Sequence, residues 1–372
     1  MLGPFGLLLA LLTPGKRCPD CKSKIHKEAS SCPFCHRTFE ITPEGTARKL
    51  APAGVIFAAL GLLLFAYFIW KAGPGKIWAQ MLSLGAGFLV VLAISSLRPV
   101  LRAAAWTRCF EAPHSLRLRD ALRAYLVGDA LGNLMPLGIV VSEPAKAAFA
   151  RERVPFVAAL AALAVENLFY MISVALFIFA GTAAMLASFP LNQKLTVAAY
   201  STLAGVVVFV IFASLLVRRQ WRFASRALEF LAARGIGRLL VASRRERVAS
   251  LEDRVYGFYA RHSRRFLPIM LLEACFHLAG VAEVYATLYF LLDPHPEPAS
   301  LALAAFVLES VNRVINVVFK FVPMRMGVDE AGTSIFTKVL RFGDTAGVTL
   351  AIVRKARVIC WTGVGVALLV RH

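Results

Sequence analysis

The chain lacks the polar composition of a soluble domain. Only 17% of its 372 residues are charged, whereas hydrophobic residues make up 58%. A typical soluble domain has roughly 45–50% apolar residues. Several apolar runs are longer than the ~18 residues that can cross a hydrocarbon core. These features exclude an ordinary soluble protein and predict an integral membrane protein.

Acidic residues are particularly scarce. The chain has 22 Asp and Glu against 42 Lys and Arg, which gives a formal net charge of +20. In a soluble protein this balance would suggest nucleic-acid binding, but no RNA- or DNA-binding motif accompanies it. The Arg residues cluster between apolar runs, as expected of cytoplasmic loops that attract anionic lipid. We therefore expect a membrane-lipid partner and no nucleic acid.

Two further features are missing. No long extramembrane loop carries the paired acids that a membrane-embedded enzyme would need. Residues 1–15 are apolar, but they lack the basic n-region of a signal peptide and are too short to span a bilayer. We expect this segment to be interfacial or to result from an upstream mis-start.

Cysteine is sparse but strongly patterned. Four of the seven Cys residues form two Cys-x-x-Cys pairs within residues 16–40, namely Cys18, Cys21, Cys32 and Cys35. Four thiolates at this spacing can bind one tetrahedral Zn²⁺ with no open position, so we expect a structural zinc ribbon. A redox pair or disulfides are the alternatives, and reducing cytosol disfavours disulfides. The ribbon offers a possible site for a protein partner.

The remaining chain reads as linker and membrane domain. Residues 41–50 form the linker, and residues 51–372 form an all-α domain of six to eight membrane segments. The expected spans are residues 51–70, 77–97, 155–180, 195–217, 266–292, 301–322 and 345–370. Basic stretches at 98–123 and 218–265 place these loops and the ribbon in the cytoplasm, and the protein in the cell membrane.

Two segments between these spans repeat one pattern. Pro136 is followed by Gly138 and then by Glu143, and Pro323 is followed by Gly327 and then by Glu330. In both, the Glu lies seven positions after the Pro. Helix-breaking residues beside a carboxylate, occurring twice, indicate broken or re-entrant helices of a transporter-like repeat. Simple span counting places both elements in the cytoplasm, whereas an inverted repeat places them on opposite sides.

Ionisable residues also occur inside the expected spans, where they are costly and usually functional. Glu309, Arg313 and Asn316 recur at helical spacing, and Glu309 can pair with Arg313 at i, i+4. Further charges lie deep in other helices, namely Glu166, Arg354 and Arg357. Such residues could be structural, holding helices together by hydrogen bonds. As a set with excess cation, they predict a polar cavity for an anionic guest such as a lipid phosphate.

The residues Asn133, Pro136, Glu143 and Lys146 resemble the Asn-x-x-Pro … Gly-Glu-x-x-Arg signature of the lysylphosphatidylglycerol synthase transmembrane, or flippase-like, family. Residues from Pro323 to Glu330 resemble its second signature, Pro-Gly-Gly-x-Gly-x-x-Glu-Ala. The resemblance covers residues 50–370. Members are thought to move amino-acylated or glycosylated lipids between leaflets. Here the spacing before Glu143 is longer, and Lys146 and Met324-Arg325 depart from the pattern, which leaves the lipid open.

These features together predict a lipid-translocating membrane protein for an anionic or modified lipid, either amino-acylated or polyprenyl-linked. The chain shows no aminoacyl-transferase or glycosyltransferase domain, so we expect no enzymatic activity. The alternatives are a membrane-embedded lipid-modifying enzyme and a non-transporting scaffold or sensor that uses the ribbon. The residues expected along the lipid path are Asn133, Pro136, Glu143, Lys146, Glu166, Glu309, Arg313, Asn316, Gly327, Glu330, Arg354 and Arg357.

Overall fold

A computed structural model of the chain describes four long stretches, residues 73–134, 138–218, 261–319 and 327–371. It also describes the isolated positions 16–17, 24–25, 67, 70, 257–258, 322 and 325. The four ribbon cysteines, the expected span at 51–70 and most of the basic stretch at 218–265 lie outside the described residues. The predicted zinc ribbon therefore stays a prediction.

The described elements are almost entirely helical. Two short strands at the N-terminal end, β1 and β2, pair in antiparallel register, with Lys16 opposite Ile25 and Arg17 opposite Lys24. In chain order, the elements are β1 (Lys16–Arg17), β2 (Lys24–Ile25), α3 (Pro74–Leu84), α4 (Gly87–Arg108), α5 (Leu118–Leu134), α6 (Gly138–Phe149), η1 (Ala150–Glu152), α7 (Phe156–Ser188), α8 (Gln193–Arg218), α12 (Ser263–Leu291), α13 (Pro298–Val318), α14 (Val328–Val339) and α15 (Gly343–Val370).

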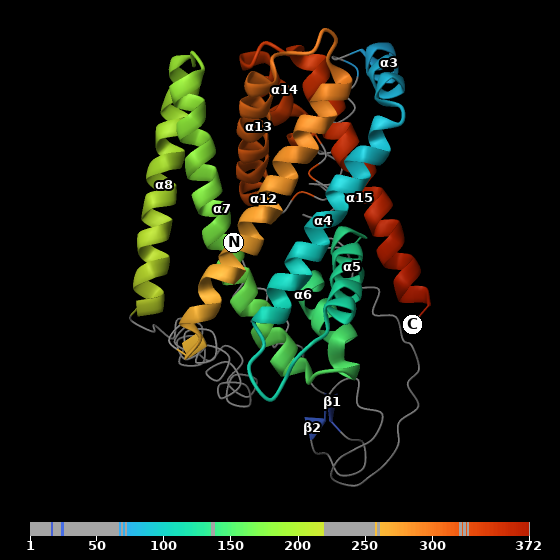
Figure 1. Ribbon diagram of the computed structural model, residues 1–372, viewed down its shortest axis with the longest axis vertical. Coiled ribbons are helices and arrows are strands. Elements are labelled where there is room, and N and C mark those ends of the chain that lie inside the picture. Colours follow the sequence, from blue (N-terminus) through green and yellow to red (C-terminus); the bar gives the residue numbers. More distant parts are fainter. Residues whose placement is uncertain are drawn as a thin grey trace.

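Five of the described helices are long and apolar enough to cross a membrane, namely α4, α7, α8, α12 and α13. They form an upright bundle with α15, which carries charges in its middle (Figure 1). Helix α7 is apolar nearly all round, as expected of a helix enclosed by protein and lipid. The chain is thus an all-α, multi-pass membrane protein, as its sequence predicts.

The two broken elements are helical hairpins. Helices α5 and α6 pack together and are three residues apart in the sequence, and α13 and α14 form a second packed pair. Figure 1 shows that α5 and α6 enter the bundle from the end where α4 terminates, whereas α13 and α14 enter from the opposite end. The arrangement is that of an inverted repeat, which the sequence had left undecided against simple span counting.

The repeat extends to the neighbouring helices. Helix α4, the first hairpin and α7 form one unit, and α12, the second hairpin and α15 form the other, with reversed chain direction (Figure 1). Polar backbone at a hairpin tip is tolerated inside a membrane only where protein or a water-filled cavity surrounds it. The interior of the bundle, where the two hairpins meet, is therefore the place to look for a site.

Two boundaries differ from the sequence prediction. The span expected at 77–97 consists of two helices, because Gly85 adopts a positive φ of 42° and ends α3. Helix α4 then continues to Arg108 rather than ending before the basic stretch at 98–123. Ala103, Ala105 and Trp106 in its second half are buried. Packing of this half against the bundle therefore extends the helix into a stretch whose basic charge had suggested a loop.

Candidate functional site

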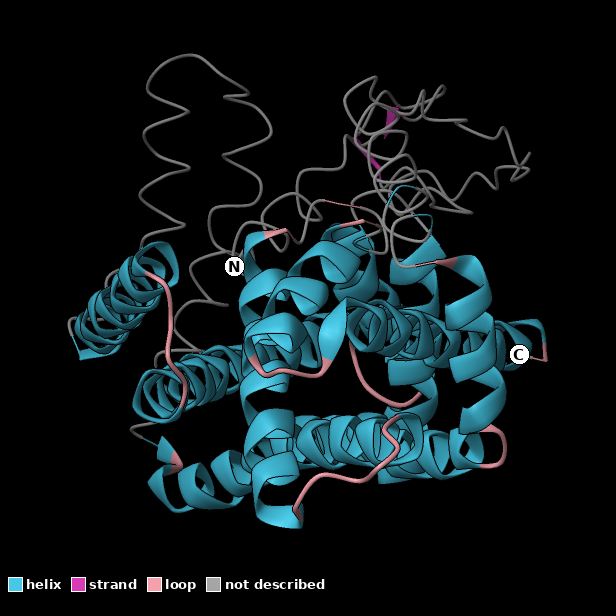
Figure 2. Cartoon of the chain, turned by 90° about the horizontal axis from the view of Figure 1, so that it is seen from above, coloured by secondary structure: helices cyan, strands magenta, loops and turns pink. Residues whose placement is uncertain are grey.

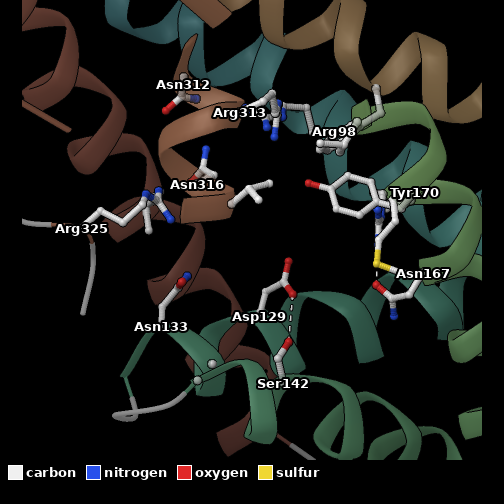
Figure 3. Close-up of a pocket in the computed structure, with 18 of the residues that line it drawn as sticks. Arg98, Asp129, Asn133, Ser142, Asn167, Tyr170, Asn312, Arg313, Asn316 and Arg325 are labelled. Atoms are coloured by element: carbon white, nitrogen blue, oxygen red, sulfur yellow. Dashed lines mark hydrogen bonds between the residues drawn. The ribbon is translucent and has the colours of Figure 1, made fainter. Parts of the chain in front are cut away.

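A cavity of about 750 Å³ lies between the two hairpin tips and is lined by residues from α4 to α8 and from α12 to α15. This is within the range of ~300–1,000 Å³ that is usual for small-molecule sites. Figure 3 shows Arg98, Asn133, Asn167, Arg313 and Asn316 around one open space, although they come from different helices. The tips of both hairpins thus contribute polar side chains to a single cavity.

Glu309 is the centre of one ion-pair cluster. Its carboxylate is 1% exposed and pairs with Arg313 one helical turn away on α13. Arg354 Nη2 on α15 lies 3.2 Å from Glu309 Oε2, and Arg98 Nη2 on α4 lies 3.9 Å from Oε1. The predicted Glu309–Arg313 pair is confirmed, and three guanidinium groups share one carboxylate.

Glu283 of α12 extends this cluster. Arg98 Nη1 lies 3.2 Å from Glu283 Oε2, and Arg357 of α15 pairs with the same oxygen. Four guanidinium groups therefore surround two carboxylates, Glu283 and Glu309. We call these six side chains the arginine cluster; its formal charge is +2, which favours an anionic guest in a medium of low dielectric constant.

Arg102 organises the opposite side of the site. Its Nε lies 2.7 Å from Glu166 Oε1, and its Nη2 donates to Glu166 Oε2 at 3.0 Å. Its Nη1 is 3.6 Å from Glu273 Oε2. The Arg102 guanidinium also lies over the Tyr170 ring, 3.8 Å from its centroid, and Nε donates to the Tyr125 hydroxyl at 2.8 Å.

Lys146 of α6, a helix of the first hairpin, lies on the same side of the site as Arg102. Its Nζ lies 2.9 Å from Asp129 Oδ1 and 3.1 Å from Glu143 Oε1, and Asn167 Nδ2 donates to Glu143 Oε2 at 3.0 Å. We call the combined set the carboxylate cluster, and its members are Arg102, Asp129, Glu143, Lys146, Glu166 and Glu273. Four carboxylates meet two cations there, so the formal charge is −2, opposite to that of the arginine cluster.

The second hairpin holds a third, balanced group. Gly327 has a φ of 76° at the start of α14, and its N–H donates to Glu330 Oε2 at 2.7 Å. Lys355 of α15 pairs with Glu330 and lies 3.7 Å from Asp329, which also pairs with Arg325 at 3.2 Å. Glu330 therefore caps a helix N-terminus inside the bundle and joins the second hairpin to α15.

Among the described residues, eight cations but only three carboxylates line the cavity surface. The three carboxylates are Asp129, Glu143 and Asp329. Five more Glu residues lie behind the surface and pair with the lining cations, namely Glu166, Glu273, Glu283, Glu309 and Glu330. The site is thus close to neutral as a whole but presents mainly cationic groups to whatever occupies it.

A comparison with protein families matches residues 53–365 to the family described as "Lysylphosphatidylglycerol synthase TM region". The chain belongs to this family. The match includes all the described helices from α3 to most of α15, so both hairpins and the cavity are part of the family region. Comparisons with curated proteins and with solved structures find no significant match.

In this member of the lysylphosphatidylglycerol synthase TM-region family, most residues expected along a lipid path meet in one place. Seven of them line the cavity directly and three lie behind it as ion-pair partners, whereas Gly327 caps α14 and Pro136 lies outside the described residues. The lining residues are Asn133, Glu143, Lys146, Asn316, Arg354 and Arg357, joined by Arg313, and those behind are Glu166, Glu309 and Glu330.

Sequence reasoning missed Arg98, Arg102 and Glu283. The two Arg residues were assigned to a cytoplasmic loop because they directly follow the apolar run that ends at Leu97. Their spacing of four places them on one helical face, and this periodicity could have indicated a helix that continues. Glu283 lies inside the span expected at 266–292, so its charge was a signal of the kind that singled out Glu166, but its partners Arg98 and Arg357 are distant in sequence.

Proposed function

We propose that this protein binds the head group of an anionic or modified membrane lipid in the cavity and moves that lipid between leaflets. The observation that carries the proposal is a cavity within membrane helices whose described surface has eight cations and three carboxylates. Arg binds phosphate through two parallel N–H···O hydrogen bonds. A lipid phosphate is an anion that a membrane can supply to such a cavity.

The division of charge supports a narrower choice of lipid. The arginine cluster suits a phosphate, and the carboxylate cluster suits an amine on the same head group. An amino-acylated phospholipid would satisfy both clusters, whereas a polyprenyl phosphate would use the arginine cluster alone. We therefore favour the amino-acylated lipid, with the polyprenyl-linked lipid as the alternative.

Two features favour translocation over catalysis. Inverted hairpins that meet at the centre of a bundle are typical of alternating-access transporters. In addition, each carboxylate that lines the cavity is already paired with a cation, Asp129 and Glu143 with Lys146 and Asp329 with Arg325. Such pairing favours positioning of charge over the acid–base chemistry of a lipid-modifying enzyme.

The N-terminal segment adds a separate module in this proposal. We propose that Cys18, Cys21, Cys32 and Cys35 hold a structural zinc ion on the cytoplasmic side of the cell membrane. The ribbon would then be available to a protein partner while the helices handle lipid. The basic stretches at 98–123 and 218–265 of the sequence support this orientation through the positive-inside rule.

The test is lipid exchange in vesicles reconstituted with the full chain. The protein is purified in mild detergent, its co-purifying lipids are identified by mass spectrometry, and the enriched lipid is then supplied in a labelled form. We expect Arg354→Ala to lose most of the enrichment and most of the transfer. Arg153→Ala is the matched control, because Arg153 is 67% exposed and lies outside the cavity.

Wild-type enrichment and transfer in Arg354→Ala would refute the assignment of the site. Co-purification of bulk lipid alone, unchanged in Arg354→Ala, would favour the scaffold alternative. Chemical conversion of the labelled lipid by the purified protein would instead revive the enzyme alternative.

A further inference from the structure

Helix α8 is held to the bundle mainly at its beginning. Ala199 is buried and packs with Met185 of α7 and with Val307 and Val311 of α13. Beyond this contact α8 keeps α7 as its main neighbour and lies at the margin of the bundle (Figures 1 and 2). The helix thus stays beside α7 but diverges from α13 after its beginning.

The cavity extends into the space that this divergence leaves. Gly205, Val206 and Phe209 of α8 line it on one side, and Val314, Val317 and Val318 of α13 line it on the other. We call these six residues the lateral opening. A Cβ atom built on Gly205 would meet nothing within 4 Å, so the opening is not filled by side chains at this point.

Other contacts around the cavity are closed. A Cβ on Gly365 of α15 would overlap the Leu126 carbonyl of α5, so these helices touch backbone to backbone. At the same contact, Asn133 Nδ2 donates to Thr362 Oγ1 at 3.0 Å. A Cβ on Gly181 of α7 would likewise overlap Ser310 of α13. Neither contact leaves room for a chain to pass from the cavity to the membrane.

The opening and the cavity differ sharply in chemistry. The six residues of the lateral opening are apolar or glycine, with the uncharged polar residues Thr202 and Asn316 beside them, whereas the arginine cluster lies further inside the same space. A phospholipid has the same two-part character, with a charged head and hydrocarbon chains. Chains left in apolar surroundings avoid the cost of exposing hydrocarbon to a polar cavity.

We propose that the lateral opening binds a hydrocarbon chain of the lipid whose head group occupies the cavity. This inference rests on the proposed function, and it adds the route by which the chain stays in the membrane while the head group moves. Helix α8 and the C-terminal end of α13 would then contact the hydrocarbon chain from two sides as it moves.

Photo-cross-linking tests this site without relying on transport. The probe is a phosphatidylglycerol that carries a diazirine in one acyl chain, and the cross-linked peptides are mapped by mass spectrometry. We expect cross-links on residues 199–215 of α8 and 311–318 of α13. Excess unlabelled polyprenyl phosphate is then added as a competitor. A loss of cross-linking indicates a site for any hydrocarbon chain that bears a phosphate, whereas unchanged cross-linking indicates a site that requires a diacyl lipid.

Gly205→Phe places a ring in the opening at a position where a built Cβ meets nothing within 4 Å, so it should remove most of the cross-linking and slow transfer several-fold. Gly363→Phe is the matched control, because Gly363 is also helical, has nothing within 4 Å of a built Cβ and does not line the cavity. Elution as a single species in size-exclusion chromatography shows that each variant is folded. If Gly205→Phe is not folded by this criterion, the positions of the cross-links in the unsubstituted protein test the proposed chain site by themselves.

Cross-links on α5 and α15, or equal cross-linking in both variants, would overturn the proposed chain site. Lipid transfer that persists alongside either result would leave the proposed function standing. Conversely, cross-links at the lateral opening in a protein that transfers no lipid would support the chain site and refute translocation.

Discussion

Glu309 is the residue on which the arginine cluster depends. Arg98, Arg313 and Arg354 come from three different helices and share this one buried carboxylate. Removing one partner of a buried ion pair leaves an uncompensated charge, which is far more costly than losing an exposed pair. The packing of α4, α13 and α15 around the cavity therefore relies on a single negative charge.

We expect Glu309→Gln to lower the free energy of unfolding by about 3–5 kcal/mol, as for other buried pairs broken on one side. Thermal unfolding in detergent measures the change. Glu111→Gln is the control, because Glu111 pairs with Arg261 near the surface and such pairs contribute roughly 0–1 kcal/mol. Equal losses in the two variants would show that Glu309 has no special structural role.

At the scale of the elements, glycine sets how closely helices approach one another in both repeats. A Cβ on Gly138 at the start of α6 would overlap the Gly132 carbonyl of α5. In the second repeat, a Cβ on Gly347 of α15 would lie 2.6 Å from the Ser334 Cα of α14. Small residues that let backbones touch are the usual means of packing helices in a membrane.

Gly138→Ala should therefore open the first hairpin and destabilise the protein by about 1–3 kcal/mol, the usual cost of overpacking. The same displacement should weaken lipid binding, since Asp129 and Lys146 lie on the two helices of this hairpin. Melting temperature and lipid enrichment are the two measurements. Gly75→Ala, where a Cβ meets nothing within 4 Å, should leave both unchanged; a parallel fall there would argue against hairpin packing as the cause.

The elements also show what sequence could and could not reveal. Apolar length and the Pro–Gly–Glu pattern predicted the membrane helices and both broken elements, because these depend on local residues. The Glu309–Arg313 pair was predictable for the same reason, since one helical turn separates its members. The pairing of Glu283 with Arg98 and Arg357 was not, because only the packing of α4, α12 and α15 brings these residues together.

At the scale of the whole molecule, the ribbon and the helices should be separable. We expect the Cys18→Ser, Cys21→Ser double variant to lose bound zinc, because two of four thiolate ligands are removed. Zinc content by elemental mass spectrometry and lipid transfer in vesicles are measured on the same preparation. Retained zinc would contradict the predicted ribbon, whereas zinc loss accompanied by loss of transfer would show that the two modules are coupled.

The inverted arrangement of the hairpins makes a prediction about membrane sides. Ser115 precedes the first hairpin and Arg341 follows the second, and both are exposed. Because the hairpins enter from opposite ends of the bundle (Figure 1), a cysteine at each position should face a different compartment. An impermeant thiol reagent added outside sealed, right-side-out vesicles should label Arg341→Cys, and it should label Ser115→Cys only after the vesicles are opened.

Labelling of the unsubstituted chain corrects for its native cysteines. Both positions reacting from the same side would return the topology to simple span counting. It would also remove the main structural reason to expect alternating access. Two hairpins on the same side of the membrane cannot expose the cavity first to one side and then to the other. Opposite labelling would instead mean that the charged cavity is reached from each side past a different hairpin, as translocation of a head group requires.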